Sequence, residues 1–196
     1  GAELNKIVLE CPEKGLSGIE MLTGIPGSLG GAVRMNAGGR FGDIGDSVVS
    51  VTLMDNLGNI FEKSKPELMF DYRSTNITAN LILEVKIRLT ETDPDQVLKN
   101  LKETWIYKKN HQPLNTRNSG CIFKNPRGKS AGILIDKTGL KGLQIGGASV
   151  SEKHANFIIA EKGCKSRDVM RLIQAIQERV YQQFNIELET EIEIWN

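Results

Sequence analysis

The sequence predicts an α+β fold, and three observations support that class. Residues 48–62 and 81–89 have the β-branched, alternating composition of strands. Residues 94–110 and 166–180 repeat apolar side chains at helical spacing. The glycine-rich segment 24–39 contains no GxxxxGKS or GxxxxGKT motif and does not open a helix after a parallel strand, so it matches neither a P-loop nor a dinucleotide fingerprint. The two folds that these fingerprints mark are therefore disfavoured.

Length and charge narrow the classes of function. A chain of 196 residues is long enough to bury a core, as one large domain or two small ones. Its 25 lysines and arginines against 24 acids leave a net charge of +1, so no surface field of one sign would attract nucleic acid or anionic lipid. No apolar run approaches the ~20 residues of a membrane span, and no signal peptide is recognisable. We therefore expect a cytoplasmic protein that binds neither nucleic acid nor membrane.

Cysteine usage agrees with that compartment. Cys11, Cys121 and Cys164 are odd in number and widely spaced, without CxxC pairs. Such spacing fits neither a secreted disulfide scaffold nor a structural zinc site. The simplest interpretation is three reduced thiols and no bound metal.

The first half of the chain alternates short elements with turns. Residues 5–14 can form a short helix, which the following glycines end. Strands at 48–54 and 60–62 flank a turn at 55–59 that contains Asp, Asn and Gly, which predicts a hairpin. Residues 81–89 alternate apolar and charged side chains in their second half, as a strand with one solvated face does.

The second half is more helical. Residues 94–110 form a predicted helix with Asp93 as a candidate cap and a proline in the first turn. A shorter helix over 131–138 is closed by Gly139. A longer helix follows Ser166, whose hydroxyl is the candidate cap.

Acidic and apolar residues alternate near the end of the chain, over residues 187–195. A period of two is that of a strand, with the glutamates on one side and the apolar residues on the other. We interpret this segment as a terminal strand with a solvated edge. A catalytic role for one of the glutamates is the minority alternative from periodicity alone.

The strongest candidate for a binding loop is the segment 24–39, with six glycines in sixteen residues. Glycine allows positive φ and a close approach of the backbone, so main-chain N–H groups can be aimed at a phosphate or a planar cofactor. The alternative is that the glycines only turn tight corners. Composition leaves both interpretations open and favours the ligand.

Two further side chains could carry chemistry. Cys121 could donate a proton or act as a nucleophile, and the nearby Lys124 would favour its thiolate. The alternative for Cys121 is a half-buried cysteine that behaves as a small hydrophobe. Arg73 could present its planar guanidinium to a carboxylate, although a surface salt bridge is the commoner fate of an arginine.

Short motifs in a consistent order cover nearly the whole chain. They lie at residues 15–20, 24–31, 35–38, 72–73, 119–126, 140–142, 145–148, 153–158 and 188–191. Together these motifs resemble the UDP-N-acetylenolpyruvoylglucosamine reductase family, flavoenzymes of peptidoglycan synthesis. The resemblance implies the C-terminal part of an FAD-binding type-2 (PCMH-like) domain plus an α+β substrate-binding domain.

The resemblance also implies a domain division. Residues 1–116, completed by the terminal strand 186–196, would be a partial FAD-binding domain, and residues 117–185 would be the substrate-binding domain. Family members normally begin with a further domain whose own glycine-rich loop grips FAD, and this sequence starts after it. Because a cofactor shared between two domains loses most of its contacts when one is absent, we expect this chain alone to bind FAD weakly and to be weak or inactive unless that domain is supplied separately.

The implied activity is reduction of UDP-N-acetylglucosamine enolpyruvate to UDP-N-acetylmuramate with FAD and NADPH. In the family, NADPH reduces FAD, and hydride then passes to the enolpyruvyl double bond while an acid protonates the neighbouring carbon. The alternative is a non-catalytic remnant that keeps nucleotide-sugar binding. The residues implied to hold FAD lie in the glycine-rich segment: Gly24, Ile25, Pro26, Gly27, Ser28, Gly30, Gly31, Asn36 and Gly38.

The remaining roles come from the same resemblance. Arg73 would bind the substrate carboxylate and stabilise the enolate-like intermediate, and Glu191 would complete that catalytic site. Cys121 stands where the family carries its proton donor, a serine in many members and a cysteine in others. The residues implied to contact the nucleotide sugar are Tyr72, Lys124 and Asn125.

Overall fold

Helices and antiparallel strands are mixed in the computed structural model, which describes residues 1–195 and confirms the α+β class. Packing divides the chain into two units, residues 1–107 and the residues from 108 onward. The division therefore lies before the predicted boundary between 116 and 117. The intervening residues are hydrogen-bonded within the second unit, where the ammonium of Lys153 donates to the carbonyl of Lys109 and Nδ2 of Asn118 donates to the carbonyl of Pro113 at 3.0 Å.

The first unit begins with the predicted short helix. It consists of α1 (Leu4–Glu10) and a 3-10 turn (Pro12–Lys14). Gly15 ends the turn in the left-handed region, with φ of +60°. The chain then enters β1 (Leu16–Ser17), which pairs with β9 (Thr90–Glu91).

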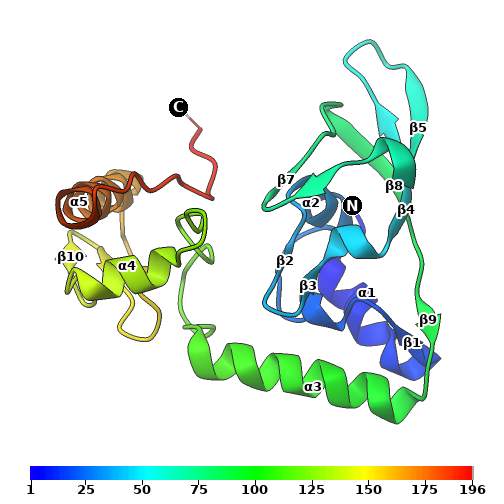
Figure 1. The fold of residues 1–196 in the computed structure, drawn as a ribbon, viewed down its shortest axis with the longest axis horizontal. Coiled ribbons are helices and arrows are strands. Elements are labelled where there is room, and N and C mark those ends of the chain that lie inside the picture. Colours follow the sequence, from blue (N-terminus) through cyan, green and yellow to red (C-terminus); the bar gives the residue numbers. More distant parts are fainter. Residues whose placement is uncertain (196) are drawn as a thin grey trace. The chain divides into compact units, whose positions relative to one another are not determined.

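The largest sheet of the first unit has the strand order β5–β4–β8 (Figure 1). The central strand is β4 (Val48–Met54), and β5 (Ile60–Ser64) and β8 (Leu81–Ile87) pair with it on either side. The predicted hairpin is confirmed. Its turn is held by Asp55, whose carboxylate accepts the N–H groups of Leu57 and Asn59 at 2.8 and 2.9 Å.

Shorter elements surround this sheet. They are the helix α2 (Leu29–Arg34), the strand pairs β2 (Gly38–Gly39) with β3 (Gly42–Asp43) and β6 (Phe70–Asp71) with β7 (Ser74–Thr75), and the 3-10 turns Glu20–Leu22, Ile44–Asp46 and Lys65–Glu67. The glycine-rich segment is therefore not the plain loop that its composition predicts. It contains a short helix because Ser28 caps α2 at its start.

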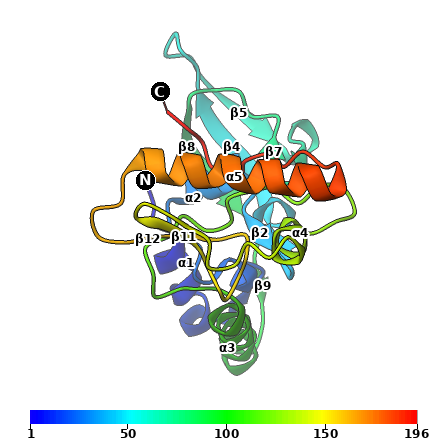
Figure 2. The same ribbon diagram turned by 90° about the vertical axis from the view of Figure 1, so that its left-hand side faces the viewer.

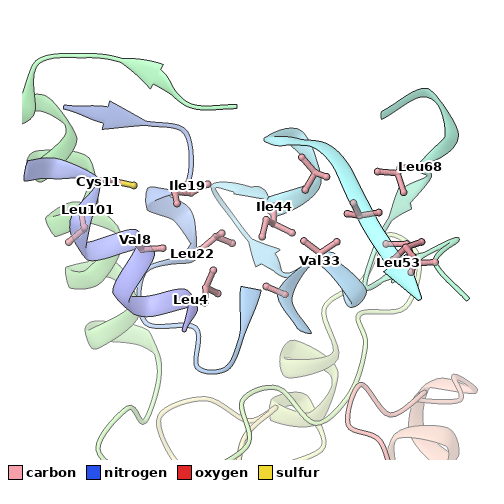
Figure 3. Packing of buried hydrophobic residues seen from close by; sticks show 14 of the residues in the cluster. Leu4, Val8, Cys11, Ile19, Leu22, Val33, Ile44, Leu53, Leu68 and Leu101 are labelled. Carbon is pink, nitrogen blue, oxygen red and sulfur yellow. The ribbon is translucent and has the colours of Figure 1, made fainter. Parts of the chain in front are cut away.

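The core of the first unit joins these elements (Figure 3). Leu4 and Val8 from α1 are buried together with Val33 from α2, Ile44 from the 3-10 turn Ile44–Asp46 and Leu53 from β4. Burial of such side chains stabilises the unit by roughly 1.5–3 kcal/mol each, relative to exposure. This core thus holds the glycine-rich segment against the sheet.

The helix α3 (Pro94–His111) follows the prediction for residues 94–110. Asp93 precedes it, and its carboxylate accepts the N–H of Asp95 at 3.2 Å, as an N-cap does. Val97 and Leu101 are buried in the core of the first unit. Within residues 1–195, no helix combines the length and the apolar composition needed to cross a bilayer.

In the second unit, a long helix packs on a small antiparallel sheet and against a shorter helix (Figure 2). The strands are β10 (Gln144–Ile145), β11 (Ala148–Val150) and β12 (Ile158–Ala160), and the helices are α4 (Ala131–Lys137) and α5 (Ser166–Phe184). The apolar face of α5 contacts β10, β11 and α4. This packing provides the core of the second unit.

The predicted cap of α5 is wrong by one residue. Lys165 occupies the N-cap position, and its N–H donates to the carboxylate of Asp168 at 3.3 Å. Ser166 is the first helical residue instead. The acidic side chain in the first turn thus supplies the capping contact that sequence analysis assigned to the hydroxyl.

The predicted terminal strand is also wrong. Residues 187–195 form no regular strand, and Thr190 makes only an isolated bridge to Phe123. Leu188 is buried in the core of the second unit, and Ile192 packs against it. The described part of the segment 186–196 therefore belongs with the second unit and not with the first, while Asn196 lies outside the described residues.

Candidate functional site

The start of the glycine-rich segment is tied to the N-terminus of the chain. The N–H of Leu4 donates to the carbonyl of Gly27, and the N–H of Leu29 donates to the carbonyl of Ala2. Ser28 then caps α2, because its Oγ accepts the N–H of Gly31 at 3.1 Å. These bonds give the segment a defined backbone course.

Two glycines of this segment are explained by backbone geometry. Gly24 has φ of +75° and Gly27 has φ of +110°, a region that side chains with a Cβ rarely adopt. A third, Gly38, is explained by contact, since a Cβ there would lie 2.1 Å from Oδ1 of Asp43. These three positions need glycine for the fold itself.

Gly30, Gly31 and Gly39 have no such explanation. A Cβ would lie 3.6 Å from Ile82 at Gly30 and 3.4 Å from Ser28 at Gly31, both ordinary contacts, and at Gly39 it would meet no atom of the described residues within 4 Å. Glycine inside a helix costs about 1 kcal/mol relative to alanine. The glycines in α2 therefore lower the stability of the helix. Their lack of side chains would let a flat ligand such as a flavin cofactor approach the backbone closely.

The remaining predicted cofactor residues divide between the surface and the interior. Pro26 is exposed and Ser28 is partly exposed, next to Gly27. Ile25 packs against the core of the first unit. Asn36 is buried, with a relative exposure of 4%. The structure brings these residues into one segment, and contact of any of them with a cofactor stays a prediction.

Arg73 lies in the turn between β6 and β7 and is held on several sides. Its backbone is left-handed, with φ of +52°, and its guanidinium donates to the carbonyl of Gly38 at 2.9 Å. The same group lies 3.6 Å from the carboxylate of Asp43 and 5.1 Å from the ring centroid of Tyr72. Its side chain is only 15% exposed. The structure thus places Arg73 and Tyr72 beside the glycine-rich segment.

Glu20 is a buried carboxylate that sequence reasoning did not single out as a site residue. It accepts hydrogen bonds from the N–H of Gly18 and the hydroxyl of Ser17, both at 2.7 Å, and from Asn100 of α3 at 3.5 Å. Burial raises the pKa of Glu20, but these hydrogen bonds outweigh burial and hold the pKa below its ordinary value. The ionised group connects the segment before Gly24 to α3.

Aromatic side chains of α3 support the same region. Trp105 packs over Gly24, where a Cβ would lie 3.0 Å from its ring. Tyr107 meets Phe41 edge-to-face at a centroid distance of 5.4 Å, and the guanidinium of Arg40 lies 5.3 Å from the Tyr107 ring centroid. These contacts hold the start of the glycine-rich segment, and the residues that directly follow its end, against α3.

In the second unit, Cys121 begins an extended segment with a neighbour on each side. Cys121 bridges Phe157 on one side, and on the other the N–H of Glu191 donates to the carbonyl of Ile122 at 2.7 Å. Cys121 and Glu191 are both partly exposed. The structure therefore brings the two predicted catalytic residues of this unit onto adjacent backbone segments.

Asn156 fixes this extended segment and was missed as an individual residue. Its carboxamide accepts the N–H of Phe123 at 3.0 Å and donates to the carbonyl of Phe123 at 2.8 Å, and it is 3% exposed. Next to it, burial lowers the pKa of His154, so the neutral ring can accept the N–H of Asn156 at Nδ1, at 3.2 Å. An asparagine inside an apolar stretch is the signal that could have found it.

Lys124 and Asn125, the predicted nucleotide-sugar residues, have partners inside the second unit. The ammonium of Lys124 lies 2.5 Å from the carboxylate of Glu189. The carbonyl oxygen of Asn125 accepts the N–H of Ala131 at 2.9 Å, at the start of α4. Contact with a substrate remains a prediction for both. Among the described residues, His, Cys, Asp and Glu side chains form no group of three or more that could hold a metal ion.

Two family models and several known proteins match this chain. Residues 112–195 match the family model "UDP-N-acetylenolpyruvoylglucosamine reductase, C-terminal domain", and residues 1–64 match the model "FAD binding domain". Among curated relatives, the reductase of Chlamydia muridarum is 42% identical and that of Clostridioides difficile 40% identical, each over 99% of this chain. The chain spans 65% and 64% of those two relatives, respectively.

A solved structure extends the comparison to the fold. The UDP-N-acetylenolpyruvylglucosamine reductase of Thermus caldophilus is 38% identical, with a TM-score of 0.90. The match covers 99% of this chain and 70% of that one. The curated relatives and the solved structure thus match nearly the full chain, and the two family models match its two ends. The chain belongs to the UDP-N-acetylenolpyruvoylglucosamine reductase family.

Proposed function

We propose that this chain takes part in the reduction of UDP-N-acetylglucosamine enolpyruvate to UDP-N-acetylmuramate, a reaction of peptidoglycan synthesis, with FAD and NADPH as cofactors. The observation that carries the proposal is the position of Arg73, which is held in a left-handed turn with its guanidinium on the carbonyl of Gly38 in the glycine-rich segment. Residues held in a rarely populated backbone conformation cluster at functional sites, where the surrounding structure stabilises that conformation. Membership of the reductase family supplies the reaction.

FAD fits the backbone of the glycine-rich segment. Gly30, Gly31 and Gly39 present main chain without a side chain, and Gly27 has open space beside it. These residues would hold the cofactor by its approach to their peptide groups. When bound, FAD supplies hydride transfer from NADPH to the substrate.

The side chains then supply binding and a proton. Arg73 would pair with the substrate carboxylate and stabilise negative charge as it develops next to that group. Sγ of Cys121 would donate its proton to the carbon beside the one that receives hydride, and the thiolate would regain a proton from solvent. Glu191 lies on the backbone segment adjacent to Cys121 and would orient the substrate for this proton transfer.

The direct test is an assay of the chain with FAD, NADPH and UDP-N-acetylglucosamine enolpyruvate. Because the chain spans 65% of its Chlamydia muridarum relative, the assay is run alone and with the unspanned part of a relative supplied in trans. We expect substrate-dependent loss of NADPH absorbance and a product heavier than the substrate by two hydrogens. Absence of product under both conditions contradicts the proposal, and substrate binding without turnover favours a non-catalytic binding role instead.

Alanine at Gly31 separates cofactor binding from folding. Since its Cβ would make only an ordinary contact, Gly31→Ala should raise the free energy of unfolding by about 0.5–1 kcal/mol through improved helix propensity. The same methyl group would block close approach to α2, so FAD affinity should fall about tenfold or more. Thermal unfolding without cofactor and a flavin fluorescence titration measure the two effects. An unchanged FAD affinity in a stabilised protein would remove α2 from the cofactor site.

A further inference from the structure

One buried side chain, Asn36, connects three segments of the first unit. Its Oδ1 accepts the N–H of Gly45 at 3.1 Å, and its Nδ2 donates to the carbonyl of Asp71 at 2.9 Å. Asn36 itself is left-handed, with φ of +43°, and is 4% exposed. The oxygen and the nitrogen of the carboxamide therefore both make hydrogen bonds within the protein. The position of Asn36 in the glycine-rich segment, by contrast, predicts a contact with a cofactor.

The surroundings of Asn36 are closely packed. A Cβ at Gly45 would lie 2.6 Å from Cγ of Phe70 and 2.8 Å from Oδ1 of Asn36, so only glycine fits there. The ammonium of Lys65 donates to the carbonyl of Gly45 and lies 4.9 Å from the ring centroid of Phe70. The N–H and the carbonyl of Gly45 thus both have hydrogen-bond partners, which fixes the backbone that the Asn36 side chain contacts.

Asp71, the acceptor of Asn36, begins the turn that carries Arg73. Asp71 pairs with Ser74 across that turn. A left-handed conformation is unfavourable for a residue such as arginine, so the turn needs support from outside itself. Asn36 provides that support at the start of the turn, and the carbonyl of Gly38 provides it at the guanidinium.

We infer that Asn36 is a positioning residue for Arg73: by holding Asp71 against Gly45, it sets the turn that aims the guanidinium. It does so from inside the unit, without touching a cofactor. The consequence for catalysis rests on the proposed function, because it requires Arg73 to bind the substrate carboxylate. The structural part, a turn that depends on Asn36, does not.

A matched pair of substitutions tests this assignment. Asn36→Asp keeps the size, the tolerance of left-handed backbone and the acceptor for Gly45, but it replaces the donor to Asp71 by a carboxylate oxygen. Asn76→Asp is the control, because Asn76 also accepts one N–H, from Met69, and donates from Nδ2 to one carbonyl, of Glu67, at 2.9 Å. Only the first substitution removes a bond to the turn of Arg73.

The first readout is amide hydrogen exchange by NMR in the protein without ligands. Asn36→Asp should speed exchange across the 71–74 turn by about tenfold, while Asn76→Asp should act on residues 67–69 and leave the turn unchanged. In the unaltered protein, the side-chain amide protons of Asn36 should exchange slowly, which tests the bond even if the variant does not fold. Fast side-chain exchange, or an unaltered turn in Asn36→Asp, overturns the inference.

The second readout uses the assembled reductase reaction. Asn36→Asp should lower kcat by about 10- to 100-fold, as expected for a misplaced binding group, with FAD affinity and KM for NADPH within twofold of the unaltered protein. A weakened FAD affinity with an unchanged turn would show a cofactor contact and refute the positioning role. If the unaltered protein has no turnover, the proposed function fails, whereas the exchange experiment still decides the role of Asn36 in the turn.

Discussion

Replacing Cys121 by alanine is expected to slow protonation of the substrate by about 100- to 10,000-fold, the range for loss of a positioned proton donor. The thiol lies at the start of an extended segment held by Phe157 on one side and by the 189–191 segment on the other. Alanine leaves that backbone pairing intact. The loss should therefore come from chemistry and not from folding.

Two half-reactions measured separately under anaerobic conditions check this result. Reduction of flavin by NADPH should be unchanged in Cys121→Ala, whereas reoxidation of flavin by the enolpyruvyl substrate should carry the whole defect. Cys121→Ser should retain more activity, because a hydroxyl can also donate a proton. Cys164→Ala is the matched control, since Cys164 is likewise a partly exposed thiol of the second unit. Equal losses in both half-reactions would show that Cys121 is not the proton donor.

Replacing Arg73 by lysine is expected to lower kcat by about 100- to 1,000-fold, as when one preorganised electrostatic donor is removed. Lysine keeps the charge but not the planar fork that matches a carboxylate. It also cannot reproduce the present geometry, in which one guanidinium reaches the carbonyl of Gly38, the carboxylate of Asp43 and the ring of Tyr72. The effect should fall on the substrate half-reaction.

Glycine at the same position separates function from folding. Arg73→Gly removes the side chain but relieves a left-handed residue of its Cβ, so we expect a loss of activity at least as large as for lysine without a matching loss in unfolding temperature. Arg40→Lys is the control, because Arg40 directly follows the glycine-rich segment and also contacts an aromatic ring. Stopped-flow kinetics and thermal unfolding supply the readouts. Normal kcat in Arg73→Lys would exclude a role for the guanidinium fork.

Sequence reasoning was most successful where contiguous residues decide the conformation. The hairpin of β4 and β5 depends on β-branched strands and on the Asp55 turn, and α3 depends on helical spacing and on Asp93. Each of these interactions spans only a few residues. The prediction of a terminal strand at residues 187–195 was wrong. Alternation of acidic and apolar residues indicates which side chains are buried, but a strand also needs a partner strand along its length, and this segment forms a bridge only at Thr190.

The candidate site was predicted only in part. Motifs placed Arg73 and Cys121 in a known family, which the comparisons confirm as the family of this chain. The surroundings of these residues were not predictable. Asn36 contacts Asp71 across 35 positions of sequence, and Asn156 contacts Phe123 across 33, so no local pattern predicts either partner.

Local sequence patterns therefore predicted the fold class, the hairpin and the main helices, and ordered motifs predicted the family. Three features became known from the folded structure alone: the chain divides after Tyr107, the 187–195 segment packs on the second unit, and Asn36 points inward to the Arg73 turn. The physical reason is the range of the interactions involved. Backbone propensity and capping act within a few residues, whereas burial and side-chain hydrogen bonding depend on segments that only the folded core brings together.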